Sequence, residues 1–437
     1  MFDERSRRSL EFVDAAAMTA RQDALLRDHV RHAAQRSPFY RRLFASSGVD
    51  PAEISSVADL PRLPLTEKSD LAQNEDQFLC VEMSEIADVC LTSGTTGRAV
   101  AMLQTDRDLE RVAFNEEISF RAAGIGRDDV VLITAAIDRC FMAGLAYFLG
   151  LRRIGATAIR GGSGSIAALE ELTVRNRPSV IVGVPTLLLN LAQRLEASGT
   201  APQGLGVERL VCIGEPVRNA DLSLSRLGAR LESEWGARVY GTYASTEMAT
   251  AFCDCAAGNG GHLHPDLIVL EAIDEDGRPV LPGEPGELVA TPLQVTGMPL
   301  LRFRTGDIAR VHVERCPCGR TSARVGPIIG RKSQMLKYRG TTVYPAAIFA
   351  VLQEVQGITG YYLEVYDDFE LSDRIRVVLG SQDPEFRSDH VAEALAARLR
   401  VKPEVVVASP EAVQAKTTEP GKRKPVTFFD HRRANLA

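Results

Sequence analysis

Residues 91–97 read Leu-Thr-Ser-Gly-Thr-Thr-Gly, and this run holds the groups best suited to bind an anion. Its two glycines let the backbone bend freely, so that N–H groups and hydroxyls can turn inward around a phosphate. The spacing differs from that of a Walker A loop. The residues in front, 87–91, are expected to form a short strand that feeds the loop. We therefore expect a phosphate-binding loop, with a flexible Ser/Thr/Gly surface loop as the alternative.

Two further runs place a carboxylate beside small or hydroxylated residues. Tyr-Ala-Ser-Thr-Glu (243–247) follows an expected strand, and a carboxylate at the carboxyl end of a parallel strand can hold Mg²⁺ against a phosphate. Arg-Phe-Arg-Thr-Gly-Asp (302–307) ends in an aspartate that could accept hydrogen bonds from two vicinal hydroxyls, as on a ribose. The alternatives are a solvated loop glutamate and an ordinary turn aspartate.

Cysteines and histidines between residues 253 and 318 could hold a metal ion. Two C-x-C pairs flank an H-x-H pair, and together they supply more than the four thiolate or imidazole ligands of a zinc site. The six candidates are Cys253, Cys255, His262, His264, Cys316 and Cys318. Four reduced surface thiols are the alternative, because C-x-C is a less typical zinc knuckle than C-x-x-C.

Length and composition limit what must position these groups. A chain of 437 residues is too long for one typical core, so at least two domains are expected. The net charge of −6 gives no electrostatic reason to expect nucleic acid. We expect no membrane span, because no apolar run approaches 18 residues, and we expect a cytoplasmic location, because residues 1–12 lack a signal-peptide pattern.

Hydrophobic periodicity predicts an amphipathic helical lead-in over 5–34 and then alternating strands and helices from about 128 to 245. This rhythm is typical of a largely parallel α/β sheet. The predicted strands are 129–134, 179–185, 210–214 and 237–241. The predicted helices are 142–154, 166–176, 187–197 and 220–234.

The pattern changes after about residue 265, where helices give way to antiparallel strands separated by turns. These strands are expected at 267–274, 286–291 and 308–313. A break follows at 330–333, and the remaining residues predict a small α+β domain. Its elements are a helix at 344–355, strands near 361–366 and 374–379, a helix near 388–400 and a strand at 404–408.

The order and spacing of these runs resemble the adenylate-forming superfamily of acyl-CoA synthetases and adenylation domains, and within it the phenylacetate–CoA ligase family. Pro-Phe-Tyr-Arg-Arg-Leu-Phe (38–44) and Asp-Leu-Pro-Arg-Leu-Pro-Leu-Thr-Glu-Lys (59–68) resemble the N-terminal signature of that family. The implied fold is α/β, with a large N-terminal domain for ATP and acyl binding (1–331) that combines mixed sheets, helices and a small antiparallel β subdomain. That subdomain, about 250–325, would bind zinc, and 332–437 would form a small mobile α+β domain.

The resemblance also implies roles for individual residues. The residues that cradle the ATP phosphates are Thr92, Ser93, Gly94, Thr95, Thr96 and Gly97. The adenine and the segment around it involve Gly214, Glu215, Pro216, Tyr243, Ala244 and Ser245. Thr246 would lie near the α-phosphate, Glu247 would bind Mg²⁺, and Asp307 and Arg331 would hold the ribose. The lysine of adenylation would be Lys424, with Lys422 as the alternative.

Candidates for an apolar acyl pocket are Phe141, Ala143, Gly144, Val184 and Pro185, with core packing as the alternative. Members of the resembled family that carry zinc imply the preferred ligand set Cys255, His262, Cys316 and Cys318. Four protein ligands leave no open position, so the zinc would be structural. Three positions depart from the family pattern: Arg98 stands where a lysine is common, Ser333 stands at the hinge position that aspartate usually fills, and Ala244 stands where glycine is common.

The implied reaction has two displacements. A carboxylate attacks the α-phosphate of ATP and releases pyrophosphate, and a thiol then attacks the acyl-adenylate and releases AMP. The cofactors would be ATP, Mg²⁺, CoA and structural Zn²⁺, and the substrate a small carboxylic acid, aromatic by resemblance only. The acceptor stays open between CoA, a carrier-protein thiol and an amine. A non-catalytic nucleotide-binding protein and a homodimer also remain open.

Overall fold

The computed structural model describes residues 10–92, 99–338, 341–367, 373–383, 386–418 and 425–432. Two compact units emerge, the first made of Met1–Thr305 with Ala309–Ile328, and the second of Gly306–Ile308 with Ile329–Ala437. The chain passes from the first unit to the second next to the predicted domain boundary at 331/332. Mobility of the second domain stays a prediction.

The first unit begins with two helices, α2 (Ala15–Arg36) and α3 (Pro38–Ser47), which extend the predicted lead-in. The Asp14 side chain caps α2, and Ser37 caps α3 by accepting a hydrogen bond from the N–H of Tyr40. The aromatic rings of Phe39, Tyr40 and Phe44, all in α3, pack with the ring of Phe78. This packing holds the segment that contains the 38–44 signature.

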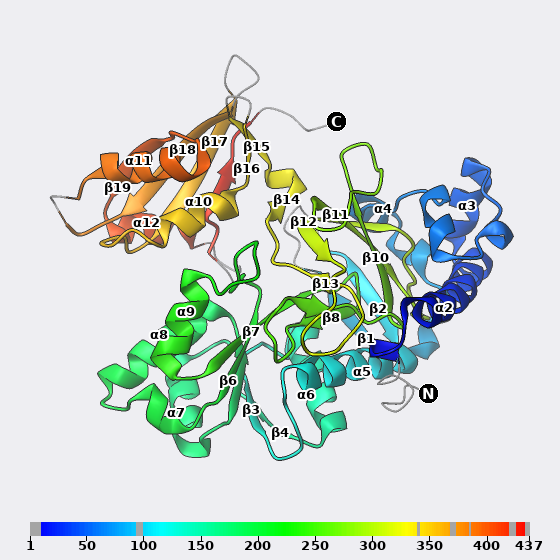
Figure 1. Cartoon of the computed structure of the whole chain (residues 1–437), viewed down its shortest axis with the longest axis horizontal. Coiled ribbons are helices and arrows are strands. Elements are labelled where there is room, and N and C mark those ends of the chain that lie inside the picture. The colour runs from blue at the N-terminus through cyan, green and yellow to red at the C-terminus, as the bar shows by residue number, and fades with distance from the viewer. Residues whose placement is uncertain are drawn as a thin grey trace. The chain divides into compact units, whose positions relative to one another are not determined.

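A six-stranded sheet forms the centre of the unit, with the order β4-β3-β5-β6-β7-β8. Five of its strands run parallel and β8 is antiparallel. The strands are β3 (Val130–Ile133), β4 (Thr157–Arg160), β5 (Val180–Gly183), β6 (Arg209–Ile213), β7 (Arg238–Ser245) and β8 (Thr250–Cys253). The helices between them are α6 (Met142–Ile154), α7 (Ile166–Asn176), α8 (Pro185–Ala197) and α9 (Arg226–Trp235), as Figure 1 shows. The predicted parallel α/β sheet is confirmed.

Helices α9 and α5 (Asp106–Ala122) of the first unit differ from the predictions. The predicted helix 220–234 begins only at Arg226, because Leu222 has a φ of +70° and Ser225 caps the first turn of α9. Helix α5 was not predicted. It is buried on nearly every side and carries polar residues inside, so its sequence lacks the apolar stripe that marks a surface helix.

An antiparallel sheet follows, in the order β10-β11-β12-β13-β9, with β14 paired to β12. Its strands are β9 (Gly261–His262), β10 (Ile268–Ile273), β11 (Pro285–Pro292), β12 (Phe303–His312), β13 (Arg324–Val325) and β14 (Gly330–Arg331). The last predicted strand, 308–313, starts earlier, because Phe303 already bridges to Thr66. A separate hairpin pairs β1 (Ile86–Leu91) with β2 (Ala101–Thr105).

The second unit contains a four-stranded sheet in the order β19-β18-β17-β20 and a hairpin, β15–β16. The strands are β15 (Leu336–Tyr338), β16 (Thr341–Val343), β17 (Tyr361–Asp367), β18 (Asp373–Gly380), β19 (Glu404–Ala408) and β20 (Phe428–Asp430). The helices are α10 (Pro345–Leu352), α11 (Ser388–Leu399) and α12 (Pro410–Thr417). The short helix α4 (Lys68–Asn74) belongs to the first unit. The predicted α+β character is confirmed, although α12 and β20 were not predicted.

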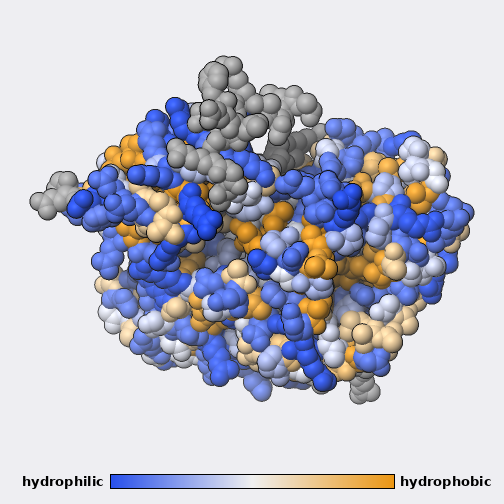
Figure 2. All heavy atoms as spheres, turned by 45° about the horizontal axis from the view of Figure 1, so that its top comes forward, coloured by the Kyte–Doolittle hydropathy of each residue, from blue (hydrophilic) through white to orange (hydrophobic). Residues whose placement is uncertain are grey.

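None of the described helices is long and apolar enough to cross a membrane. On the face of the molecule in Figure 2, hydrophobic residues are interspersed with hydrophilic ones.

Candidate functional site

The carboxyl ends of β3, β5, β6 and β7 meet at one edge of the parallel sheet, where ligands of open α/β sheets usually bind. The turn after β7 carries Thr246 and Glu247. Glu247 is buried, at 9% exposure, although it lies in a turn. The alternative of a freely solvated loop carboxylate is therefore wrong.

Arg111 of α5 holds the turn that carries Thr246 and Glu247 in place. Its side chain is fully buried, and it donates hydrogen bonds to the carbonyl of Ala249 and, at 3.1 Å, to Oγ1 of Thr250. Ala249 has a φ of +47°, and its N–H donates to the carbonyl of Thr246 at 3.1 Å. A non-glycine residue in this conformation needs such support, so Arg111 fixes the backbone from which Glu247 projects.

Lys68, the first residue of α4, contacts the Glu247 carboxylate. Its Nζ donates to Oε1 of Glu247 at 3.1 Å, across 179 residues of sequence. The Lys68 side chain is 29% exposed and the Glu247 side chain 10%. In the sequence, Lys68 is the last residue of the 59–68 signature, and no role was predicted for it. The signal that could have singled it out is its isolation, because no other lysine precedes Lys332.

The segment predicted to line the adenine follows β6. Gly214 has a φ of +76°, a conformation that favours glycine, and it is exposed. The side chain of Glu215 accepts hydrogen bonds from the N–H (3.1 Å) and Oγ1 (2.9 Å) of Thr186, in the first turn of α8. Glu215 thus ties the end of β6 to the neighbouring helix.

Tyr243, Ala244 and Ser245 lie in β7 and pair with β8. Tyr243 is opposite Phe252, with their ring centroids 6.2 Å apart, while Ala244 is exposed. The hydroxyl of Ser245 accepts a hydrogen bond from the N–H of Met248 at 3.2 Å. These contacts shape the turn that carries Glu247, and the predicted adenine contact of Tyr243 stays a prediction.

Thr92 is buried at the start of the predicted phosphate loop. Its N–H and its Oγ1 both bond Val100 across the loop base, each at 3.0 Å. The other predicted loop residues lie outside the described residues: Ser93, Gly94, Thr95, Thr96 and Gly97. The same holds for both candidate lysines of adenylation, Lys422 and Lys424.

The predicted acyl-pocket residues sit at the starts of two helices on this edge. Phe141 precedes α6, Val184 precedes α8 and Pro185 is the first residue of α8. Gly144 packs so tightly that an added Cβ would lie 2.2 Å from the carbonyl oxygen of Ala136, so close packing already requires glycine there. The small cavity next to Glu247 is lined by other described residues, Met102, Gln104, Val295 and Met298 among them. The acyl-pocket roles, including that of Ala143, stay predictions.

Asp307 and Arg331, predicted to hold a ribose, are neighbours. They pair across β12 and β14, and Nε of Arg331 lies 3.3 Å from Oδ1 of Asp307. Asp307 is buried, at 9% exposure, while the arginine side chain is 45% exposed. A buried carboxylate on a strand next to an exposed cation could accept hydrogen bonds from paired hydroxyls.

A second candidate site joins Cys255, His262, Cys316 and Cys318. One ligand atom from each lies within 4.8 Å of the other three. Sγ of Cys255 is 3.6 Å from Sγ of Cys316, and Sγ of Cys318 is 3.4 Å from Nε2 of His262. Ligands about 2.3 Å from a tetrahedral zinc are separated by about 3.8 Å, so this set fits the metal.

Protonation at this cluster favours metal binding at His262 and Cys318 and opposes it at Cys255. Burial, with the charges of Arg320 and Arg324, lowers the pKa of His262 to about 4, so its ring is neutral. Burial raises the pKa of Cys255 to about 12. Burial opposes ionisation of Cys318 too, yet hydrogen bonds with the backbone and side chain of Arg320 hold its pKa below the usual value. The alternative of surface thiols is wrong, because Cys255 and Cys316 are buried.

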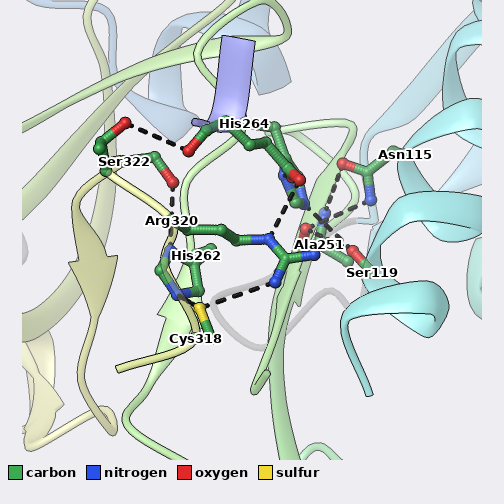
Figure 3. A network of polar contacts seen from close by, with 10 residues as sticks. Asn115, Ser119, Ala251, His262, His264, Cys318, Arg320 and Ser322 are labelled. Atoms are coloured by element: carbon green, nitrogen blue, oxygen red, sulfur yellow. Dashed lines mark hydrogen bonds and ion pairs between the residues drawn. The ribbon is translucent and has the colours of Figure 1, made fainter. Parts of the chain in front are cut away.

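Arg320 and Ser322 support the cluster from outside, as Figure 3 shows. Nη1 of Arg320 lies 3.6 Å from Sγ of Cys318, and its Nε is 3.0 Å from a carboxylate oxygen of Glu11. The hydroxyl of Ser322 is 3.1 Å from Nδ1 of His262, which fixes the ring with Nε2 toward the sulfurs. Cys253 and His264 lie outside the four-residue group, in agreement with the preferred set.

Comparisons with known proteins agree with this arrangement. The pattern of the family described as AMP-binding enzyme matches residues 13–297. Phenylacetate-coenzyme A ligase of Thermus thermophilus is 33% identical over 397 residues, which cover 88% of each chain. The enzyme of the same name from Pseudomonas putida is 29% identical and covers 83% of this chain and 82% of its own.

A solved structure of a 2-hydroxyisobutyryl-CoA ligase, in complex with 2-HIB-AMP in the postadenylation state, superposes with a TM-score of 0.86. It is 24% identical and covers 97% of this chain and 91% of its own, a likeness that shows the fold. The family pattern covers more than half of the chain, and the Thermus relative matches along most of it. With its predicted phosphate loop and the buried glutamate at the sheet edge, the chain belongs to the family of AMP-binding enzymes.

Proposed function

We propose that the protein is an ATP-dependent carboxylic acid–CoA ligase that forms an acyl-AMP and then an acyl-CoA thioester. The observation that carries the proposal is the buried Glu247 carboxylate, held by a buried arginine at the carboxyl edge of a parallel sheet. Such a carboxylate can hold Mg²⁺, which offsets negative charge on the phosphates of ATP when bound. Similarity to phenylacetate-coenzyme A ligases over most of the chain supports the CoA acceptor and an aromatic acid.

The residues of this chain would contribute binding and orientation. The phosphate loop that starts at Thr92 would hold the ATP phosphates, and the segment Gly214–Glu215–Pro216 would lie along the adenine. Asp307 would accept hydrogen bonds from the ribose hydroxyls, and Lys424, or Lys422, would supply a positive charge to the α-phosphate.

The structural role of zinc is a separate proposal. Three thiols and one imidazole, whose ligand atoms lie within 4.8 Å of one another, supply four ligands and leave no open position for a substrate. We infer that the metal joins β9 to the loop of Cys316 and Cys318 and stabilises the β subdomain. It would take no part in the two displacements.

The test of function is carboxylate-dependent release of pyrophosphate over a panel of acids, with and without CoA. The panel contains phenylacetate, benzoate, 2-succinylbenzoate and 2-hydroxyisobutyrate. We expect the fastest release with an aryl acid, and consumption of CoA in step with AMP formation. Release without thioester formation would transfer the acceptor role to an amine or a carrier-protein thiol. No release with any acid would favour a nucleotide-binding protein without ligase activity.

A further inference from the structure

Lys68 stands out because of the composition of the chain. The sequence has 44 arginines and seven lysines, and Lys68 is the only lysine in the first 331 residues. It is also the first residue of α4, where a positive charge interacts unfavourably with the helix dipole. A lysine at such a position, in a stretch of 331 residues whose other long basic side chains are all arginines, points to a need for a compact ammonium rather than a planar guanidinium.

The backbone before Lys68 is held firmly. Thr66 bridges to Phe303, its N–H donates to the carbonyl of Arg302 at 3.0 Å, and its carbonyl accepts from the N–H of Arg304 at 2.9 Å. Its hydroxyl donates to the carbonyl of Leu301 at 2.8 Å. These bonds fix the origin of the Lys68 side chain as tightly as Arg111 fixes that of Glu247.

Glu67 adds a second anchor from its own side chain. Nη1 of Arg304 lies 3.2 Å from Oε1 of Glu67, and the same guanidinium also pairs with the buried Glu287. The segment before Lys68 and the turn that carries Glu247 are therefore each held by several hydrogen bonds or ion pairs. The contact of Lys68 with Glu247 is a preset feature of the fold and not a chance encounter of flexible side chains.

We propose that Lys68 is a phosphate-binding residue of the adenylation step, which neutralises Glu247 until Mg²⁺ and ATP arrive. This proposal rests on the proposed function. The ammonium and a divalent cation would crowd one carboxylate, so metal binding at Glu247 releases the Nζ of Lys68. ATP supplies the negative charges that then hold both cations, and the ammonium contacts the phosphoryl oxygens a few ångströms away.

If the metal ion displaces Lys68 from Glu247, removal of the lysine should strengthen metal binding and slow acyl-AMP formation. Lys68→Met removes the cation that competes for Glu247, so nucleotide-free protein should bind Mn²⁺, used as a paramagnetic probe, several-fold more tightly. The same variant should form acyl-AMP about 10²-fold more slowly at saturating ATP and acid, the scale of removing one electrostatic stabiliser. Lys68→Arg should restore little of this rate, because a guanidinium is larger and planar.

The matched control is Arg62→Met. Arg62 is an exposed cation of the same N-terminal segment, and its ion-pair partner is Glu53 and not Glu247. This variant should bind Mn²⁺ and form acyl-AMP like the wild type. Addition of Glu247→Gln to Lys68→Met should abolish the gain in Mn²⁺ affinity, because the carboxylate that gains the metal is then missing.

Weaker Mn²⁺ binding by Lys68→Met, or acyl-AMP formation at the wild-type rate, would overturn the proposal and assign Lys68 a structural role. Failure of the proposed function gives a different pattern. If the wild type activates no acid, Mn²⁺ and ATP binding still report on Lys68. Tighter Mn²⁺ and weaker ATP binding by Lys68→Met would then support the exchange, and equal binding would contradict it.

Discussion

The cysteine–histidine cluster and the sheet-edge site differ in how completely the fold assembles them. In the cluster, four ligands from three separate segments already contact one another, and most of them are buried. At the sheet edge, Glu247 and Lys68 touch, but Gly214 and Ala244 face outward, and each predicted role needs a ligand to bring the groups together. A structural centre can be complete in the folded chain, whereas a site for several substrates must leave room for them.

This comparison predicts that a change at the sheet edge affects rate more than stability. Glu247→Gln should slow acyl-AMP formation about 10²-fold or more, because the amide keeps the shape of the side chain but loses the charge that binds Mg²⁺. Single-turnover pyrophosphate release at saturating Mg²⁺ measures the effect. Glu196→Gln, an exposed glutamate of α8, is the control and should behave like the wild type. Near-normal release by Glu247→Gln would refute the assignment.

Changes in the cluster should have the reverse effect. Purified protein should contain close to one zinc per chain, and replacing Cys316 and Cys318 by Ser should release it. The melting temperature should fall, because a metal that binds only the folded chain stabilises it by several kcal/mol. Elemental analysis and thermal unfolding measure both effects, with exposed Cys140→Ser as the control. Removal of the metal by a chelator without loss of stability would show that the site is not structural.

Glu116 offers a pH-dependent test of a buried group that belongs to neither site. It lies where α5 packs on α6, so close to Gly150 that a Cβ there would be 2.4 Å from its own Cβ. Burial raises its pKa from 4.5 to about 8, so the folded protein keeps it protonated. The contribution of Glu116 to the free energy of unfolding is fully present below pH 4.5 and is lost as pH rises toward 8. In that pH range Glu116 ionises in the unfolded chain but stays protonated in the folded one, so rising pH favours unfolding.

The free energy of unfolding of Glu116→Gln should therefore rise relative to that of the wild type as pH rises. Between pH 6 and pH 8.5 the difference should grow by a few kcal/mol, since one pKa unit corresponds to about 1.4 kcal/mol. Denaturant unfolding at both pH values measures the difference. Glu110→Gln, an exposed residue of the same helix, should show no such trend. A pH-independent difference between Glu116→Gln and wild type would mean that Glu116 is ionised in the fold.

The sequence predicted the elements with a strong period and missed those without one. Helices α6 and α7 begin and end where expected, because their apolar residues repeat at helical spacing between clear turns. Helix α5 was missed because most of its residues are buried, with Arg111, Asn115 and Glu116 among them. The side chains of Arg111 and Asn115 are explained only by partners far away in the sequence, such as the carbonyls of Ala249 and Ala251.

The candidate sites follow the same rule. The four cluster ligands could be named because the resemblance to zinc-carrying members of the family selected them from six candidates of suitable residue type. The contact of Lys68 with Glu247 could not, because it joins residues that lie 179 positions apart and meet only in the folded chain. A lone lysine carries no spacing pattern, and only its rarity in this chain marked it.

The smallest expected effect concerns Glu215, which separates a contact within the fold from a contact with nucleotide. Its carboxylate bonds the N–H and hydroxyl of Thr186 in the first turn of α8. Glu215→Ala should lower stability by about 1 kcal/mol, as for loss of a helix cap, while acyl-AMP formation at saturating ATP stays within a few-fold of wild type. Thr186→Val removes only the hydroxyl half of the contact and should cost less. Unchanged unfolding together with a large rise in the KM for ATP would instead show that the Glu215 side chain turns to the adenine when nucleotide binds.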